Sequence, residues 1–202
     1  MSIYLASRSP RRRELLQQIG VRYEPLLFRE GNRADPDTDE SVKAGEDPDA
    51  YVRRVTTMKA NAAWARVTMR RGLQRKPVLV ADTTVALTTE VLGKPADKAD
   101  AERMLALLAG TRHRVLTAVA IIQESRIEML VNESHVTFAP LAPERIAAYV
   151  QSGESFDKAG AYGIQGRAAS FVERIEGSYS GIMGLPLYET AVLLARFGIA
   201  VP

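Results

Sequence analysis

The chain has 202 residues, and a composition of 46% hydrophobic and 25% charged residues with a net charge of +3 is that of an ordinary globular protein. No apolar run approaches the roughly 20 residues that span a bilayer, and the N-terminus lacks the basic-then-apolar order of a signal peptide. The absence of cysteine excludes disulfides and thiolate zinc sites, and the two histidines stand too far apart to suggest a metal cluster. We therefore expect a soluble cytoplasmic protein in which any metal is a hard cation bound by oxygen.

The first predicted elements are a strand and a helix. Residues 3–6 form a short apolar run typical of a strand. Ser9 supplies an N-cap hydroxyl, and Pro10 suits the first helical position. Apolar residues at helical spacing follow until Gly20, a typical C-terminal stop. The sequence predicts a helix that starts at about Pro10 and ends before Gly20.

Four arginines surround the start of this predicted helix: Arg8, Arg11, Arg12 and Arg13. A helix N-terminus carries a partial positive charge and free N–H groups, so each cation there costs about 0.3–1 kcal/mol. One interpretation is that the long side chains simply extend into water. The interpretation that we favour is a bound anion, most simply a phosphate held by the helix end and the guanidinium groups.

The next segments predict a loop, a helix and a strand. The stretch 30–49 is crowded with Asp, Glu, Gly and Pro, which predicts a mobile surface loop. A helix with an apolar stripe then opens at Pro48, and Lys59 lies beside that stripe. Residues 78–81 are continuously apolar, as in a strand buried on both faces, and Asp82 follows directly. We therefore expect Asp82 at the end of a buried strand.

The second half of the chain alternates strands, helices and glycine-rich loops. Segments 155–169 and 177–184 have the composition of loops in which the backbone can approach a ligand closely. The other elements are predicted as a hairpin over 83–95, a helix over 97–109, paired strands over 113–122 and 127–138, a helix over 143–152, a strand over 171–175 and a helix over 186–197. The order predicts a mixed α/β chain without internal repeats.

The residues available for chemistry point to phosphate. The chain has no GxxxxGK[ST], HExxH or GxSxG motif, and no GxGxxG after a strand. A carboxylate at Asp82 could hold Mg²⁺ or orient water while Lys59, Lys94 and Lys158 and the arginines contact phosphates, which suits attack on a phosphoryl group. Three alternatives stay open: Asp82 caps the turn after it, Lys94 is a surface lysine, and Lys158 pairs with Asp157.

A second basic run comprises Arg70, Arg71, Arg75 and Lys76. Such runs are mostly solvated, and the net charge of the chain is modest. We interpret the run as the end of a helix and a loop. Nucleic-acid binding is the less favoured alternative.

Four separated segments resemble motifs of the Maf family of nucleoside triphosphate pyrophosphatases. They are LASRSPRRRELL (5–16), VADTTV (80–85), DKAGAYGIQG (157–166) and GSYSGIMGLPLYET (177–190), in order along almost the whole chain. The resemblance implies one domain over 1–202 with an α/β fold like that of the inosine triphosphate pyrophosphatases. In that fold an elongated mixed β-sheet is flanked by helices that form two lobes around a cleft, usually in a homodimer.

The resemblance also implies a reaction and its residues. A nucleoside triphosphate is hydrolysed between its α- and β-phosphates with the help of a divalent cation, Mg²⁺ or Mn²⁺. Asp82 matches the catalytic carboxylate, which is expected to accept a proton or to activate a metal-linked water. The other matching positions bind substrate: Ser9, Arg11 and Arg12 in the phosphate-binding turn, and Lys59, Lys94, Lys158 and Gln165 in the cleft.

Three positions bear on the choice of nucleotide. Subgroups resembling the dTTP/UTP enzymes have arginine, threonine and glutamine where this chain has Arg11, Thr83 and Gln165. The subgroup acting on 7-methyl-GTP is expected to have tryptophan, glutamine and glutamate there. Gln165 offers a donor and an acceptor to a pyrimidine edge, and the small Thr83 leaves room for a base. We therefore expect dTTP and UTP as substrates, with 7-methyl-GTP or another modified nucleotide as the alternative.

The acidic metal ligand is harder to place. The family usually has one after the first helix and its following strand, but here the segment FREGNRADPDTDE (28–40) is longer and shifted. We choose Glu30 as the metal ligand together with Asp82, with Asp35 as the alternative. The acidic segment is expected to close over the triphosphate.

A hypothesis of another class also stays open. The family name is associated with septum formation, so the chain could be a regulatory protein that binds division machinery or nucleic acid without catalysis. A partner that still bound after neutralisation of Asp82 would favour this alternative. Nucleic-acid binding would show a steep dependence on salt.

Overall fold

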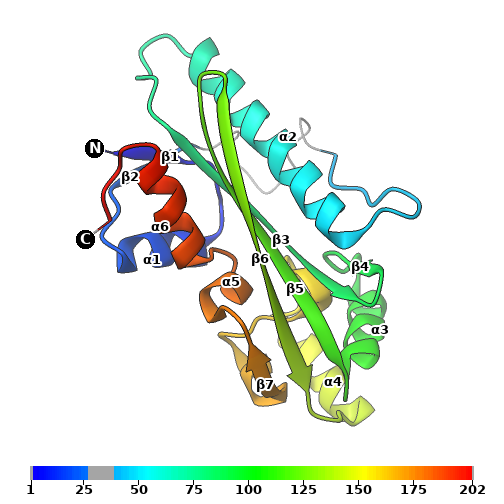
Figure 1. Ribbon diagram of the computed structural model, residues 1–202. Helices are drawn as coiled ribbons and strands as arrows, with labels where there is room; N and C mark the ends of the chain where they lie inside the picture. The colour runs from blue at the N-terminus through cyan, green and yellow to red at the C-terminus, as the bar shows by residue number, and fades with distance from the viewer. Residues whose placement is uncertain (1, 27–38, 202) are drawn as a thin grey trace.

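The computed structural model describes residues 2–26 and 39–201, which form one mixed sheet with helices on both faces (Figure 1). The seven strands are β1 (Ile3–Leu5), β2 (Tyr23–Pro25), β3 (Val78–Leu87), β4 (Glu90–Leu92), β5 (Arg112–Gln123), β6 (Arg126–Phe138) and β7 (Val172–Glu176). The helices are α1 (Pro10–Gln18), α2 (Pro48–Met69), α3 (Lys98–Leu108), α4 (Pro143–Gln151), α5 (Tyr179–Met183) and α6 (Leu187–Arg196), with short 3₁₀ turns η1 (Ala159–Ala161) and η2 (Arg167–Phe171). None of the described helices is long and apolar enough to cross a membrane.

The sheet is elongated and mixed, as predicted. Its strand order is β2-β1-β3-β5-β6-β7, and β4 pairs with β3. β1 runs parallel to β2 and β3, whereas the other pairs are antiparallel. On one edge of β3, β1 pairs only as far as Leu79 and β4 starts at Val85. The register of the described strands therefore leaves residues 80–84 without a strand partner on that edge.

Alternate residues of β3 point to opposite faces of the sheet and divide the core. Leu79 and Ala81 pack with α1 and α6, and Val85 packs on the same face with α3 and α4. Val80 and Ala86 face the other way and pack beneath α2. One face thus carries two helical clusters, one at each end, and the other face is covered by the long helix α2 (Figure 1). These two clusters agree with the expected lobes.

Helix starts follow the sequence signals closely. The Ser9 hydroxyl accepts the backbone N–H of Arg12, as the predicted N-cap requires. Asp47 and Asp97 cap α2 and α3 in the same way. The strands predicted over 113–122, 127–138 and 171–175 and the helices predicted over 143–152 and 186–197 are confirmed within one or two residues. The predicted hairpin over 83–95 is confirmed in its pairing of β3 with β4.

Two sequence predictions are wrong in their boundaries. β3 does not end before Asp82 but continues to Leu87, because β5 pairs with it residue by residue through this stretch. The alternative that Asp82 caps a turn is wrong for the same reason. The predicted loop 177–184 contains the short helix α5, which Ser178 caps and Gly184 ends with a left-handed φ of 112°. β2 was not predicted.

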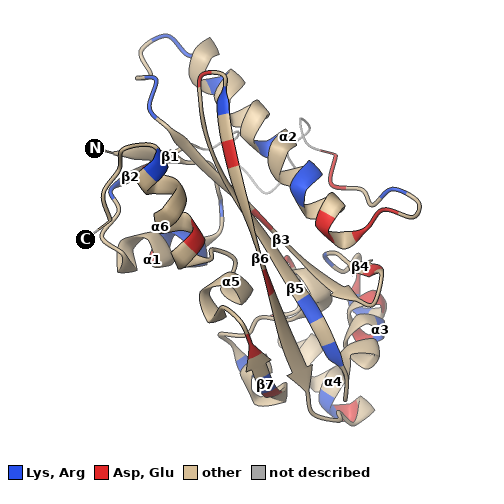
Figure 2. Ribbon diagram, viewed as in Figure 1, with Lys and Arg blue, Asp and Glu red and all other residues tan. Residues whose placement is uncertain are grey.

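The acidic stretch is only partly described. Residues 39–46 have no regular structure and lie at the surface, as expected of a loop. The predicted metal ligand Glu30 and its alternative Asp35 lie outside the described residues. The basic residues of the loop after α2 lie at one end of the molecule, far from α3 and α4 (Figure 2).

Candidate active site

Asp82 lies in the middle of β3 on the face that α2 covers. Its side chain is 12% exposed, and Oδ1 accepts a hydrogen bond from Nζ of Lys59 at 2.6 Å. Burial lowers the pKa of Lys59, but the charges of Asp82 and Glu40 outweigh that effect and raise it overall. Lys59 is therefore a cation at any physiological pH. The structure brings these two predicted residues together from a strand and a helix.

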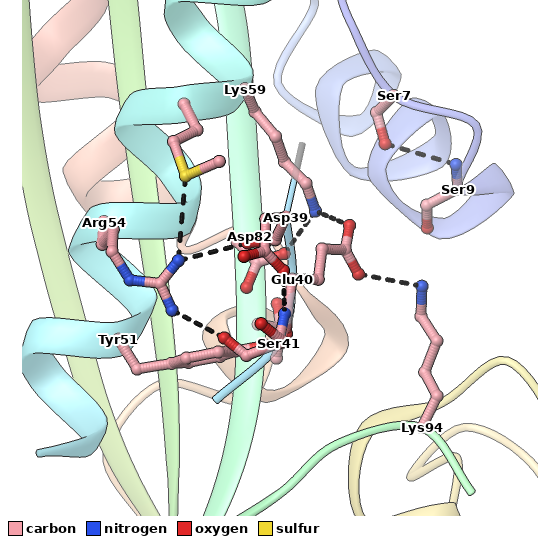
Figure 3. A network of polar contacts seen from close by, with 12 residues as sticks. Ser7, Ser9, Asp39, Glu40, Ser41, Tyr51, Arg54, Lys59, Asp82 and Lys94 are labelled. Atoms are coloured by element: carbon pink, nitrogen blue, oxygen red, sulfur yellow. Dashed lines mark hydrogen bonds and ion pairs between the residues drawn. The ribbon is translucent and has the colours of Figure 1, made fainter. Parts of the chain in front are cut away.

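Glu40 is a site residue that the sequence prediction missed. Its carboxylate lies 2.7 Å from Nζ of Lys59 and 3.6 Å from Nζ of Lys94 (Figure 3). Burial raises the pKa of Glu40, but Lys59 and Lys94 outweigh it and hold the pKa below its ordinary value. Glu40 ends the same acidic segment, 28–40, in which Glu30 is the predicted metal ligand. The position of an acidic residue after the first helix does not show which acid of the segment lies near β3 in the folded chain.

Lys94 follows β4 and reaches the site from the far end of the β3 edge. Its side chain is 58% exposed, so it is a surface lysine that also meets Glu40. Ser9 opens α1 near the residues at which β1 stops pairing with β3, and Figure 3 shows Ser7 and Ser9 on the Glu40 and Lys94 side of the cluster.

Arg12 does not extend into water. Its Nε donates to the carbonyl oxygen of Gly184 at 2.7 Å, and its Nη2 donates to Thr83 Oγ1 at 3.2 Å. Burial lowers the pKa of Arg12, and the charge of Asp82 opposes the shift. Arg12 therefore joins the start of α1 to the α5–α6 turn and to β3. Arg8 and Arg13 are exposed and Arg11 is half-buried.

Thr83 points away from Asp82, toward the other face of the sheet. Its hydroxyl lies 2.9 Å from that of Thr117, its pairing partner on β5, and Thr117 lies 2.8 Å from the carbonyl oxygen of Gly181. This polar row separates the two apolar clusters on that face, because Ala81 belongs to one and Val85 to the other. Thr83 thus holds Arg12 at the junction of the two lobes.

Lys158 comes from the lobe opposite Arg11. Its Nζ donates to the carbonyl oxygens of Glu154 at 2.6 Å and Phe156 at 3.4 Å, so its hydrogen bonds go to main-chain carbonyls rather than to Asp157. The pKa of Lys158 is lowered by burial and, second, by the charge of Arg11. The two cations therefore lie close enough to repel each other across the junction.

Gln165 is exposed in the loop that follows Lys158. The Gly163 N–H donates to the hydroxyl of Tyr149, and the Glu154 carboxylate accepts the N–H of Arg167 at 2.9 Å. No hydrogen bond within the described segments joins Gln165 to Asp82. The structure thus fixes the backbone on both sides of Gln165 but does not place it in the Asp82 cluster.

The cluster offers two carboxylates and two lysines beside an arginine-bearing helix start. Glu40 and Asp82 both contact Lys59, so a hard divalent cation could bind between their oxygens. The residues that the structure describes contain no group of three or more metal-ligating side chains. A cation held by Glu40 and Asp82 would need further oxygen ligands, which substrate and water can supply. Mg²⁺ commonly binds in this way. The arrangement suits a negatively charged phosphate substrate.

Comparisons with known proteins show the family of this chain. A family model described as Maf-like protein matches residues 2–197. The chain is 57% identical over 197 residues to a dTTP/UTP pyrophosphatase of Cupriavidus metallidurans, covering 98% of this chain and 97% of that one. It is 58% identical to the dTTP/UTP pyrophosphatase of Ralstonia nicotianae, with 98% and 94% covered, and 52% identical to that of Dechloromonas aromatica, with 98% of both covered. The chain therefore belongs to the Maf family.

Proposed function

We propose that this protein is a nucleoside triphosphate pyrophosphatase that hydrolyses dTTP and UTP to the nucleoside monophosphate and pyrophosphate. The observation that carries the proposal is the meeting of Asp82, Lys59, Glu40 and Lys94 on the open edge of β3. The identity of 52–58% to dTTP/UTP pyrophosphatases over nearly the whole chain supports the choice of substrate. A carboxylate among cations suits water attack on a polyphosphate.

A divalent cation, Mg²⁺ or Mn²⁺, fits the oxygen donors of Glu40 and Asp82. Glu40 takes the role that was predicted for Glu30. When bound, the cation supplies positive charge to the phosphate oxygens. Lys59 already lies between the two carboxylates, which keeps them together in the absence of metal.

The side chains divide the work of hydrolysis. Asp82 orients the attacking water toward the α-phosphorus and accepts its proton. Lys59 and Lys94 neutralise charge on the departing pyrophosphate, and the start of α1 with Ser9 and Arg11 binds the phosphate chain. Arg12 holds this helix start against β3 through Gly184 and Thr83 and presents its charge near Asp82. The lysines and arginines thereby favour the more highly charged transition state.

The base of the nucleotide is recognised by the lobe that carries Gln165. Gln165 supplies a donor and an acceptor for a pyrimidine edge, and its loop is held by Tyr149 and Glu154. Discrimination against purines follows from this loop.

The test is a panel of triphosphates. Purified protein is incubated with dTTP, UTP, dCTP, GTP or 7-methyl-GTP, with Mg²⁺, Mn²⁺ or a chelator, and pyrophosphate is measured separately from orthophosphate. We expect the highest kcat/KM for dTTP and UTP and no turnover with the chelator. A preference for 7-methyl-GTP, or release of orthophosphate instead, would contradict the proposal.

We also propose that the protein is cytoplasmic and forms a homodimer. Both statements rest on the family resemblance. Sedimentation equilibrium at several protein concentrations tests the second: a single species of monomer mass at micromolar concentration would contradict it.

A further inference from the structure

The segment that carries Glu40 is held by two side chains of α2. Residues 39–46 form no helix or strand of their own and lie at the surface. The hydroxyl of Tyr51 donates to the carbonyl oxygen of Glu40 at 2.9 Å. Nη1 of Arg54 donates to the carbonyl oxygen of Asp39 at 3.1 Å, and Nη2 donates to that of Ser41 at 2.8 Å. Three consecutive carbonyl groups centred on Glu40 are therefore bound by one face of α2 (Figure 3).

The guanidinium group of Arg54 is fully engaged in this contact. Its Nε and Nη2 bind the two carboxylate oxygens of Glu46 at 2.6 and 2.7 Å. Its remaining N–H groups go to the carbonyls already named and toward Met58 Sδ at 3.7 Å. The carboxylate of Glu46 in turn accepts the backbone N–H of Lys43 at 3.1 Å. Arg54 thus closes the segment into a loop, because it binds both of its ends.

The contacts of Tyr51 and Arg54 with residues 39–46 form a clamp, and this clamp belongs to the same helix as Lys59. Tyr51, Arg54 and Lys59 all belong to α2, whose core contacts fix it on β3 and β5. The carbonyl contacts on either side of Glu40 fix its backbone, so its carboxylate reaches Lys59 at 2.7 Å and Lys94 at 3.6 Å. The two lysines alone bind only the end of a flexible side chain and do not fix the backbone behind it.

We propose that Arg54 and Tyr51 are positioning residues for the reaction, acting by holding Glu40 opposite Asp82 and Lys59 rather than by touching the nucleotide. The proposal rests on the proposed pyrophosphatase function for its kinetic consequences. Its structural part, the fixed backbone of 39–46, is measurable without any substrate. A second interpretation is that Arg54 and Glu46 form an ordinary stabilising ion pair.

A matched control on the same helix separates these interpretations. Arg53, the neighbour of Arg54, pairs with Asp49 at 2.6 Å, and both side chains are more than 40% exposed. This pair lies within one helix and makes no contact with residues 39–46 among the hydrogen bonds described. Arg53→Lys therefore tests the effect of altering an arginine ion pair on α2 without altering the clamp. Exposed pairs of this kind contribute little to stability.

The test variants remove the clamp in small steps. Tyr51→Phe removes one hydroxyl, and Arg54→Lys keeps the charge opposite Glu46 but cannot reach two carbonyls as well. We expect each to lower kcat/KM for dTTP by about 10- to 100-fold, the usual cost of losing a group that orients a ligand-bearing residue. Each of these two variants should also need a higher metal concentration for half-maximal turnover. Arg53→Lys should match the wild type.

A double-mutant cycle gives the sharpest kinetic readout. If Arg54 acts only through Glu40, the variant with both Glu40→Gln and Arg54→Lys should be no slower than Glu40→Gln alone. Losses that multiply would show that Arg54 acts independently of Glu40, which would overturn the proposal. Tyr51→Phe run through the same cycle provides the answer if Arg54→Lys folds poorly.

Hydrogen exchange of the free protein tests the clamp directly. The amides of Lys43 and Glu46 should exchange faster in Tyr51→Phe and Arg54→Lys than in the wild type, while the amides of α2 stay protected. In Arg53→Lys the exchange of Lys43 and Glu46 should be unchanged. If the wild type does not hydrolyse dTTP and UTP, the proposed function is wrong, but hydrogen exchange still tests whether Tyr51 and Arg54 hold residues 39–46. Unchanged exchange together with unchanged kcat/KM in an active protein would overturn the clamp alone.

Discussion

Lys59 Nζ lies 2.6 Å from Oδ1 of Asp82, although the two residues are 23 positions apart and come from a helix and a strand. The contact exists because α2 packs its apolar face across β3 and β5, where Val52, Val55 and Ala86 are fully buried. The side chains of rigid, packed elements lose little further freedom when they meet. The carboxylate and its cation are therefore in place before any nucleotide arrives.

Asp82→Asn should keep the fold and lose most of the hydrolysis of dTTP. The amide has nearly the same shape but cannot accept a proton, and removal of a general base costs about 100- to 10,000-fold in rate. Pyrophosphate release at saturating dTTP measures the loss, and the thermal midpoint checks folding. Near-normal turnover would show that Asp82 is not the proton acceptor.

Lys59→Gln should lower kcat/KM by about 100-fold, because a fixed cation facing the charge of the transition state is lost. It also leaves Glu40 and Asp82 without the cation that they share. Lys76→Gln is the control, because Lys76 pairs with Glu24 of β2, away from the site. Equal activities of the two variants would contradict a role for Lys59 in the reaction.

Gly166→Ala should disturb the loop of Gln165. A Cβ at this position would lie 2.1 Å from Oε2 of Glu154, so the carboxylate must move and lose the N–H of Arg167. Loss of one such bond predicts a rise of about tenfold in KM for dTTP, with less change in kcat. Glu154→Gln keeps an oxygen for that N–H and should stay close to the wild type. A drop in kcat at constant KM would contradict a binding role for the loop.

The free energy of unfolding should decrease as the pH is lowered, over a range set by His113. This residue is 1% exposed, its Nε2 lies 2.9 Å from the hydroxyl of Tyr162, and burial lowers the pKa of His113 to about 4. In the unfolded chain His113 binds a proton below its ordinary pKa near 6.5, whereas in the folded chain it stays neutral down to about pH 4. The free energy of unfolding therefore decreases as pH falls from 6.5 to 4. The full effect is about 3 kcal/mol. It should be absent from His113→Gln in urea unfolding at several pH values.

The His113 prediction has a built-in check, because carboxylates also titrate in that window. Their contribution is the same in the wild type and in His113→Gln, so the difference between the two pH profiles isolates His113. Parallel profiles would show that the buried imidazole accepts its proton in the folded protein.

Part of the candidate site could be predicted from the sequence. Of the residues predicted for the site, the structure brings Lys59 and Asp82 into contact, and the charge of Asp82 acts on Arg12. Their roles in binding and catalysis stay predictions. Glu40 was missed because acids crowd its segment, and nothing local distinguishes the one that packs back on α2. The strand end at Asp82 was wrong because a polar residue in a buried run looks like a boundary, whereas β5 pairs straight past it.

What the sequence alone determined is local. Ser9 and Pro10 set the start of α1, Gly20 follows its end with a positive φ, and continuous apolar runs set the strands, because such signals act through backbone geometry within a few residues. Only the tertiary structure decided that Glu40 and Asp82 contact the same lysine, Lys59, and that Arg54 binds the backbone on both sides of Glu40. Those contacts join elements far apart in the chain, and the packing of α2 on the sheet, summed over many apolar side chains, selects them.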